Sequence, residues 1–414
     1  MTTPAAESRP AGRPPDQEQA TASAGTGGRL QLPALDGYRA MAALAVLVTH
    51  VSFATGFNGH GALGAALARL DVGVPIFFVL SGFLLYRPFV AARRTARPGP
   101  DMARYARRRV ARIYPAYWVV LVVVLLQTRE LANGVRGLLA QILLLHTWWP
   151  DTVFGPPATS TGGVTFHPLG QAWTLAAEVV FYLALPFWAL LIRRLTTSAA
   201  PAHRWRAEAV GLVVLVAVAQ AWRVWMAHAA LNASQVAARS SWVFNQLDHF
   251  AFGMALAVIS VELVARGRTH LPGMAAPWLP VACWTAAAAC FYGAIHWAGL
   301  HPNQVLYTNH QQMARQWFYG GTAVFALLPA MLAPPGTGWV ARLFASPPLR
   351  ALGRVSYGIY LWQELVLFDW LRLRDQKVFT GSFPATLAVV LVVTVVVATV
   401  SWFVVERPLL HRAR

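Results

Sequence analysis

The amino-acid sequence predicts an all-α, polytopic integral membrane protein: a bundle of about ten transmembrane helices. Two features of the composition support this prediction: 57% of the 414 residues are hydrophobic, and only 12% are charged. A soluble protein carries about 25% charged residues, so this chain has too few to cover a water-exposed surface. The 34 basic residues against 16 acidic ones give a formal net charge of +18. Nucleic-acid-binding proteins place such charge on a polar, soluble face, which this composition excludes.

Apolar runs recur from Tyr38 onward, and each is long enough to cross a bilayer core, which takes about 20 residues. The spans are expected near residues 38–55, 73–91, 115–135, 171–192, 208–228, 246–264, 277–297, 316–333, 353–371 and 385–405. The stretch 136–149 is apolar but shorter, so it is either an eleventh span or an interfacial helix.

The placement of arginine predicts the orientation of these spans. The loops 92–112 and 193–207 are rich in arginine and are therefore expected in the cytoplasm, whereas 150–170 has no Lys or Arg and is expected outside. An odd number of crossings must separate the cytoplasmic loop 92–112 from the outside loop 150–170. One span, at 115–135, satisfies this, so the stretch 136–149 is better explained as an interfacial helix than as a further span. Later loops alternate in the same way, apart from a mixed-charge segment at 372–383. We therefore expect a multi-pass protein of a bacterial inner (plasma) membrane with both termini in the cytoplasm.

Three regions are predicted along the chain. Residues 1–30 are rich in small and polar residues and lack an apolar run, which indicates a disordered cytoplasmic tail and not a signal peptide. Residues 31–408 form the transmembrane domain, and 409–414 a short cytoplasmic tail. No internal repeat with matching broken helices is seen, although many secondary transporters have one.

The first predicted span carries two ionisable residues, Arg39 and His50. Such groups within a span are costly and are functional candidates by default. Because they are eleven residues apart, they lie about 20° apart around the helix and about 16 Å apart along it. They therefore share one side of the helix at different depths. The alternative is an interfacial arginine and a histidine that is bonded to a backbone carbonyl.

Polar residues interrupt two other apolar spans. Ser81 stands in the second span beside a glycine, where the chain allows close approach either of another helix or of a ligand. Glu178 stands in the fourth span, with Thr174 and Tyr182 one turn away on the same face. An unpaired buried carboxylate is expensive, so Glu178 should face a polar cavity or pair with a basic side chain.

The densest group of arginines lies in the sequence RYARRRVARIYP, between the second and third spans. Arg108 and Arg112 are four residues apart, so several guanidinium groups share one helix face. They either fix topology and contact anionic lipid or form a clamp for phosphate, which guanidinium binds bidentately. The spacing alone does not separate these two roles.

Six segments, in this order, give the chain a family resemblance. They are Arg39 to His50 (arginine, ten residues, histidine), FFVLSGFL at 77–84, RRR-x-x-R-I-x-P at 107–115, W-T-L-x-x-E-x-x-F-Y at 173–182, SYGIYL at 356–361 and E-R-P at 406–408. From Leu35 to about Pro408 the chain resembles the acyltransferase-3 family of polytopic membrane O-acyltransferases. It departs from the family at Pro75, where many members have an acidic residue, and at Gln363, where many have histidine.

The resemblance implies transfer of an acyl group, usually acetyl, from acyl-CoA to a hydroxyl of a sugar, a cell-envelope glycan or a glycosylated natural product. It implies His50 as the catalytic group, with Arg39 as its partner. The imidazole would act either as general base for the hydroxyl or as the nucleophile that carries the acyl group. Arg107, Arg109 and Arg112 would hold the phosphates of CoA.

The same resemblance extends to the surroundings of His50. Glu178 would orient His50 or a bound hydroxyl, and Ser81, Trp173 and Tyr182 are expected to contact the substrate. We expect no metal site and no tightly bound cofactor, since acyl-CoA is a donor substrate. The expected partners are acyl-CoA, the hydroxyl-bearing acceptor and membrane lipids, and not nucleic acid.

An alternative function comes from a different class of membrane protein. A proton-coupled transporter would use His50, Glu178 and Asp248 as a relay of titratable groups. The arginine-rich loop at 104–112 argues against this alternative, because a proton relay has no need of it. Substrate flux without acyl-CoA would favour it.

Overall fold

The structure is a computed structural model of the 414-residue chain. It describes residues 32–128, 134–148, 169–198, 200, 203–231, 233–268, 270–274, 276, 278–302, 307–334 and 338–413. The expected tail at 1–30 and most of the 150–170 loop lie outside these ranges. Regular secondary structure in the described residues is helical throughout, without a strand, which confirms the predicted all-α class.

Each of the ten expected spans corresponds to a long helix. These helices are α2 (Ala34–Ala54), α4 (Gly73–Arg94), α5 (Met102–Thr128), α7 (Trp173–Leu195), α8 (Arg204–His228), α10 (Val243–Ala265), α11 (Trp278–His296), α12 (Asn309–Leu332), α14 (Pro347–Leu373) and α15 (Phe383–Ser401). Eight segments of the described chain are apolar and long enough to cross a membrane. The exceptions are α12 and α14, which are 24 and 27 residues long but carry more polar side chains. The chain is thus a multi-pass membrane bundle.

Shorter elements join the long helices. They are η1 (Phe57–Gly59), α3 (Gly61–Leu67), η2 (Leu70–Val72), α6 (Gly134–Ile142), η4 (Gly170–Ala172), α9 (Ala233–Ser240), α13 (Gly338–Phe344), the π-helix η6 (Trp402–Glu406) and α16 (Arg407–Arg412). With nine residues, α6 is too short to cross the bilayer core. Tyr117 and Trp118 of α5 donate hydrogen bonds to the backbone oxygens of Gln141 (2.8 Å) and Ile142 (3.0 Å). These bonds hold the end of α6 against α5.

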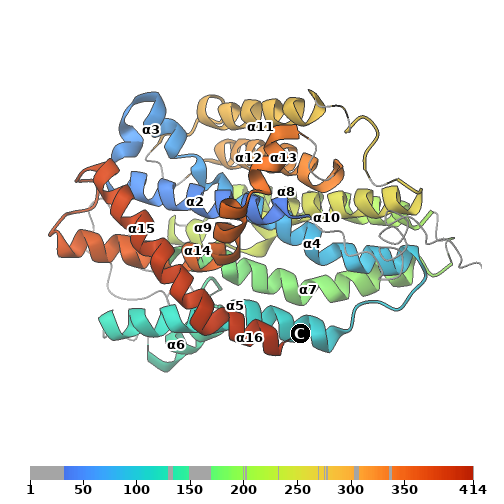
Figure 1. Ribbon diagram of the computed structural model, residues 1–414, viewed down its shortest axis with the longest axis horizontal. Helices are drawn as coiled ribbons and strands as arrows, with labels where there is room; N and C mark the ends of the chain where they lie inside the picture. Colours follow the sequence, from blue (N-terminus) through green and yellow to red (C-terminus); the bar gives the residue numbers. More distant parts are fainter. Residues whose placement is uncertain are drawn as a thin grey trace, which may run out of the picture.

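Helices α4 and α10 pack at the centre of the bundle, where two glycines let their backbones touch (Figure 1). A Cβ on Gly82 would collide with the carbonyl oxygen of Phe250, and a Cβ on Gly253 would collide with that of Val79. Small residues at such crossings allow the close backbone approach that stabilises helix pairs in membranes. The Ser81-Gly82 pair therefore serves packing through its glycine, which leaves the Ser81 hydroxyl available for another role.

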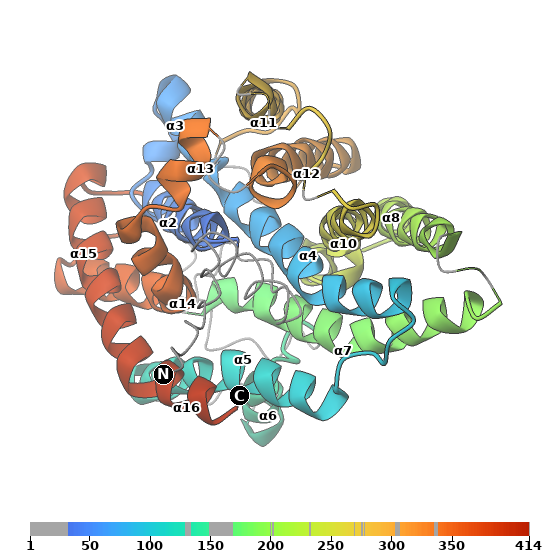
Figure 2. The same cartoon turned by 45° about the vertical axis from the view of Figure 1, so that its right-hand side comes forward.

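A second close crossing joins α2 to α14. A Cβ on Gly353 would collide with the carbonyl oxygen of Asp36, so the backbones touch here as well. The Tyr357 hydroxyl then donates to the carbonyl oxygen of Ile113, 2.6 Å away, and so links α14 to α5. In Figure 2, α2, α14 and α15 form one side of the bundle and α8 and α10 the other, with α4 and α7 between them.

The helices alternate in direction, which gives the bundle two distinct ends. We call the end that holds the start of α2, the end of α4, the start of α5 and the end of α7 the arginine-rich end, and the opposite one the far end. At the arginine-rich end, Asp101 Oδ1 accepts the backbone N–H groups of Ala103 (2.9 Å) and Arg104 (3.2 Å) at the start of α5. These hydrogen bonds, that of Arg104 above all, hold the pKa of Asp101 below its usual value.

Candidate functional site

His50, near the far end of α2, faces the carboxylate of Glu364 on α14. The Nδ1 atom of His50 lies 3.3 Å from Glu364 Oε1, and the imidazole side chain is 27% exposed. Nδ1 itself is buried and makes no hydrogen bond to the residues that the structure describes, so its contact with Glu364 is an ion-pair contact, and the exposed part of the ring lies on its other atoms. A carboxylate beside one imidazole nitrogen favours one orientation of the ring and leaves the other nitrogen, Nε2, for chemistry.

The start of α7 holds Glu364 in place. The backbone N–H of Gln171, in η4, donates to Glu364 Oε2 at 3.2 Å. The side-chain amide of Gln171 also donates to the carbonyl oxygen of Leu361, 2.9 Å away on the same helix as Glu364. Glu364 is not among the site residues predicted from the sequence, although it follows Tyr357 by seven residues and Tyr360 by four and therefore shares their helix face.

Glu178 occupies a different place, in the middle of the bundle. Its Oε1 atom accepts a hydrogen bond of 2.6 Å from Ser81 Oγ and another from the Tyr182 hydroxyl. Two roles were expected for Glu178, and the first, orientation of His50, does not fit this structure, because the carboxylate beside His50 is that of Glu364. Contact with a bound hydroxyl stays a prediction.

Glu178 lines a cavity of about 110 Å³, which we call the small cavity. Its polar lining residues are Arg39, Ser81, Arg109, Arg112, Thr174, Glu178, Tyr182, Tyr357 and Tyr360. Apolar side chains of α4, among them Phe77 and Phe78, complete the wall. The small cavity therefore combines three tyrosines, the hydroxyls of Ser81 and Thr174, one carboxylate and three guanidinium groups, with apolar side chains around them.

The three arginines expected to bind phosphate differ in position. Arg112 lies 3.6 Å from Glu406 Oε2 through its Nη1 atom, and its guanidinium stands over the ring of Tyr357 at 5.4 Å. Arg109 stands over the ring of Tyr182 at 5.6 Å. Arg107 is exposed and lines neither the small cavity nor the larger one described next.

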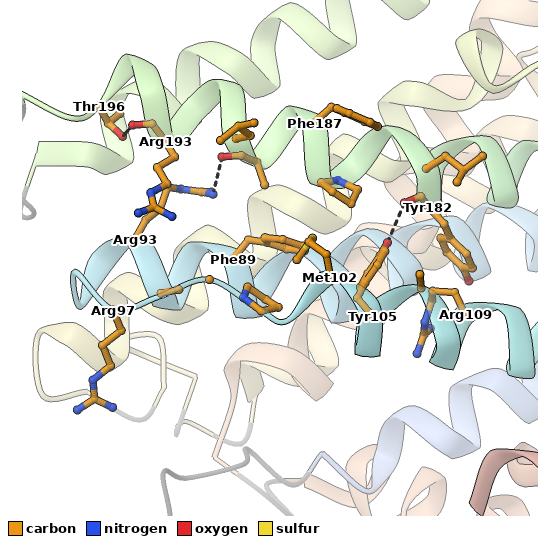
Figure 3. Close-up of a pocket in the computed structure, with 18 of the residues that line it drawn as sticks. Phe89, Arg93, Arg97, Met102, Tyr105, Arg109, Tyr182, Phe187, Arg193 and Thr196 are labelled. Atoms are coloured by element: carbon orange, nitrogen blue, oxygen red, sulfur yellow. Dashed lines mark hydrogen bonds between the residues drawn. The ribbon is translucent and has the colours of Figure 1, made fainter. Parts of the chain in front are cut away.

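A cavity of about 850 Å³, the large cavity, opens at the arginine-rich end between α4, α5 and α7. Figure 3 shows Arg93, Arg97 and Arg193 at one end of it and Arg109 and Tyr182 at the other. Arg93 is already bonded to Glu208, in a buried ion pair. The rest of the lining is mostly apolar. The large cavity thus has cationic groups at its ends and an apolar body.

The two cavities are neighbours, because Arg109, Ile113 and Tyr182 line both. At the other side of the small cavity, the Thr174 and Tyr360 hydroxyls lie 2.8 Å apart, and Tyr360 also donates to the carbonyl oxygen of Gln171 at 3.1 Å. Since the N–H of that glutamine bonds to Glu364, this layer connects the small cavity to the His50 pair. We call the hydroxyl groups of Thr174 and Tyr360 and the backbone of Gln171 the polar layer.

Two other residues selected from the sequence lie apart from these cavities. Trp173 packs edge-on against Phe78, with ring centroids 6.3 Å apart, and does not line either cavity. Asp248 is buried and pairs with Arg223, whose Nη1 lies 2.7 Å from Asp248 Oδ2. Asp248 therefore has its charge balanced on α8, in a cluster distinct from His50 and Glu178. Over the described part of the chain, no three His, Cys, Asp or Glu side chains gather as metal ligands would.

The chain was compared with known proteins. Residues 32–405 match a family model described as an acyltransferase domain. Peptidoglycan O-acetyltransferase OatA of Listeria monocytogenes is 24% identical over 351 residues, which are 82% of this chain and 50% of that protein. Exopolysaccharide production protein ExoZ of Rhizobium meliloti is 26% identical over 370 residues, 89% of this chain and 96% of that protein. Acyltransferase MdmB of Streptomyces mycarofaciens is 30% identical over 177 residues, 40% of this chain and 41% of that protein.

The extent of these matches differs between relatives. The chain spans about half the length of the peptidoglycan O-acetyltransferase of Listeria monocytogenes. It spans a similar share, 55%, of the putative peptidoglycan O-acetyltransferase YrhL of Bacillus subtilis. No solved structure matches this chain.

Proposed function

Because this chain belongs to the acyltransferase-3 family and is a membrane acyltransferase, we propose that it moves an acyl group from acyl-CoA to a hydroxyl of a carbohydrate. Acetyl is the expected acyl group. The protein lies in the bacterial plasma membrane with its arginine-rich end and both termini in the cytoplasm. The observation that carries the catalytic assignment is the His50–Glu364 pair, with Nδ1 3.3 Å from the carboxylate.

His50 can perform the transfer in one step. The hydroxyl of the acceptor gives its proton to Nε2 while its oxygen attacks the thioester carbonyl. The new C–O bond forms, the C–S bond breaks, and the CoA thiolate takes the proton from the imidazolium. Glu364 stabilises the imidazolium through Nδ1 while it carries that proton.

His50 can instead perform two steps. Nε2 attacks the thioester, and the C–S bond breaks to release CoA and an acyl-imidazole. The acceptor hydroxyl then attacks the acyl carbon, its proton leaves, and the C–N bond breaks to regenerate His50. The two routes differ in whether an acyl-enzyme survives when no acceptor is present, so labelled acyl-CoA and rapid quenching distinguish them.

The large cavity supports acyl-CoA as the donor. Its guanidinium groups at the arginine-rich end suit phosphate, which they bind bidentately. Its apolar body suits the uncharged arm that carries the thioester. Arg109 and Tyr182 stand where this cavity meets the small one, so the acyl end of the donor would enter beside Glu178 and Ser81. His50 lines neither cavity, so the acyl group must then pass Thr174 and Tyr360 to meet the imidazole.

The acceptor is proposed to be a carbohydrate hydroxyl of the cell envelope or of a glycosylated natural product. Two relatives are named for peptidoglycan and one for exopolysaccharide, which supports a glycan acceptor. Mass spectrometry of envelope glycans and secreted metabolites, from cells with and without the gene, identifies it. Loss of an acyl ester from one product upon deletion, restored by the gene, would name the acceptor.

The catalytic assignment is tested with His50→Ala in purified protein reconstituted into nanodiscs. We expect acyl transfer to fall by about 10²–10⁴-fold, the usual contribution of a general acid–base group, while CoA still binds. His310→Ala removes an exposed histidine and is the matched control. A folded His50→Ala protein that retains transfer would overturn the assignment.

A further inference from the structure

Glu406 is a buried carboxylate that the proposed reaction does not use. Its side chain is 1% exposed, and neither oxygen accepts a hydrogen bond from the residues that the structure describes. An ionised carboxylate in such a place is costly unless a cation balances it. The cation beside it is Arg112, whose Nη1 lies 3.6 Å from Glu406 Oε2.

The backbone presents Glu406 to the bundle through an unusual turn. Residues 402–406 form the π-helix η6, directly before Pro408 in the second position of α16. A proline ring collides with the carbonyl four residues earlier in an α-helix, here that of Val404, and a wider turn relieves this clash. Arg407 stands over the exposed ring of Phe403 at 5.5 Å, whereas Glu406 is buried. Single π-turns of this kind are frequent at functional sites.

The charges around the small cavity explain what such a carboxylate can do. Arg39 and Arg112 both line that cavity, and Glu406 pairs with Arg112. The distance of 3.6 Å to Arg112 is longer than the 2.7–2.9 Å of a hydrogen-bonded ion pair. Glu406 therefore balances positive charge in the small cavity without occupying the N–H groups of Arg112.

We propose that Glu406 is a positioning residue for the acyl donor, an inference that rests on acyl-CoA being that donor. Glu406 balances the charge of Arg112 before the donor binds, so less net positive charge remains in the small cavity to attract the anionic donor. This balance weakens donor affinity and keeps Arg112 at one place against Tyr357. Glu406 of the E-R-P segment thus affects donor binding through its contact with Arg112.

Binding of CoA to the full chain in nanodiscs tests this inference, with Glu406→Gln as the variant. Removal of this charge should tighten CoA binding about three- to fivefold, the modest effect of an ion pair that makes no hydrogen bond. The kcat should fall at the same time, because CoA leaves more slowly and Arg112 loses its fixed position. Asp369→Asn, which removes a half-buried carboxylate that pairs with Arg372 at the far end, is the matched control and should leave CoA affinity unchanged.

Two further variants separate this role from a structural one. Glu406→Asp keeps the charge and should restore CoA affinity toward that of the native protein. In an Arg112→Gln background the tightening by Glu406→Gln should shrink, because its partner is gone. This double variant has no charge at either position. If Glu406→Gln alone does not fold, the double variant can therefore be compared with Arg112→Gln in its place.

The outcomes distinguish this inference from the proposed function. Unchanged or weaker CoA binding by a folded Glu406→Gln protein overturns the role of Glu406, as does an undiminished effect in the Arg112→Gln background. Absence of CoA binding by the native protein instead overturns acyl-CoA as the donor. A structural role alone would lower the melting temperature and would not tighten binding.

Discussion

At the scale of single residues, the neighbour of His50 decides how the imidazole can work. Glu364→Gln keeps the shape of the side chain and removes its charge, so the imidazolium loses its stabilising partner. We expect kcat to fall by about 10²-fold or more, with little change in CoA binding, because Glu364 lines neither cavity. Steady-state kinetics in nanodiscs measure this. A Glu364→Gln enzyme with native kcat would show that the pair is structural.

The arginines of α5 allow a second test at the same scale. Arg109 stands where the two cavities meet, whereas Arg107 is exposed and lines neither. Loss of a charge-assisted phosphate contact costs about 1.5–3 kcal/mol, or about 10-fold and upward in affinity. We therefore expect Arg109→Gln to weaken CoA binding by about that factor, and Arg107→Gln by much less. Equal losses would argue for a diffuse electrostatic effect of the whole loop.

The sequence predicted part of the site because helical spacing is a local property. Thr174, Glu178 and Tyr182 were placed on one face, and all three line the small cavity. The partner of His50 was missed because the contact joins α2 to α14, more than 300 residues apart, and no local spacing reports such a contact. The sequence shows that Tyr360 and Glu364 share a helix face, but it does not show which other helix that face contacts.

At the scale of helices, the α4–α10 crossing depends on two glycines that each face a carbonyl oxygen. Gly253→Ala places a methyl group against the backbone of Val79, so the helices must move apart. We expect a loss of about 1–3 kcal/mol of stability, as overpacking usually costs, seen as a lower melting temperature in detergent. Gly99→Ala, where a Cβ meets nothing within 4 Å, is the control. Equal melting temperatures for the two variants would contradict a tight crossing.

Hydropathy predicted the long helices well because a span must be apolar along most of its length. The regions of α12 and α14 were recognised as spans although they are the more polar ones, since their polar side chains face the protein and not lipid, as Gln316 and Gln363 do. The π-helix was not foreseen. Pro408 was visible, but the turn that it imposes on Glu406 depends on how the end of α15 packs.

At the scale of the whole molecule, the alternation of arginine-rich loops makes a topology prediction. We expect both termini and the large cavity in the cytoplasm, and the segment near Ala298 outside. A fluorescent protein fused after Arg412 should fluoresce. A cysteine at the exposed His301, in a chain with Cys283 and Cys290 replaced by serine, should react with an impermeant maleimide added to whole cells. Labelling only after lysis would reverse the orientation.

The polar layer has a consequence for the membrane itself. An enzyme with one substrate site near each face of a bilayer risks an aqueous path between them, through which protons would run down their gradient. Thr174 and Tyr360 bond to each other and to the backbone carbonyl of Gln171, and Phe77 packs edge-on against Tyr360, with ring centroids 6.0 Å apart. With the donor proposed at the arginine-rich end and His50 near the far end, these bonded groups lie between the two and should oppose a continuous file of water, so that the cell keeps its proton-motive force.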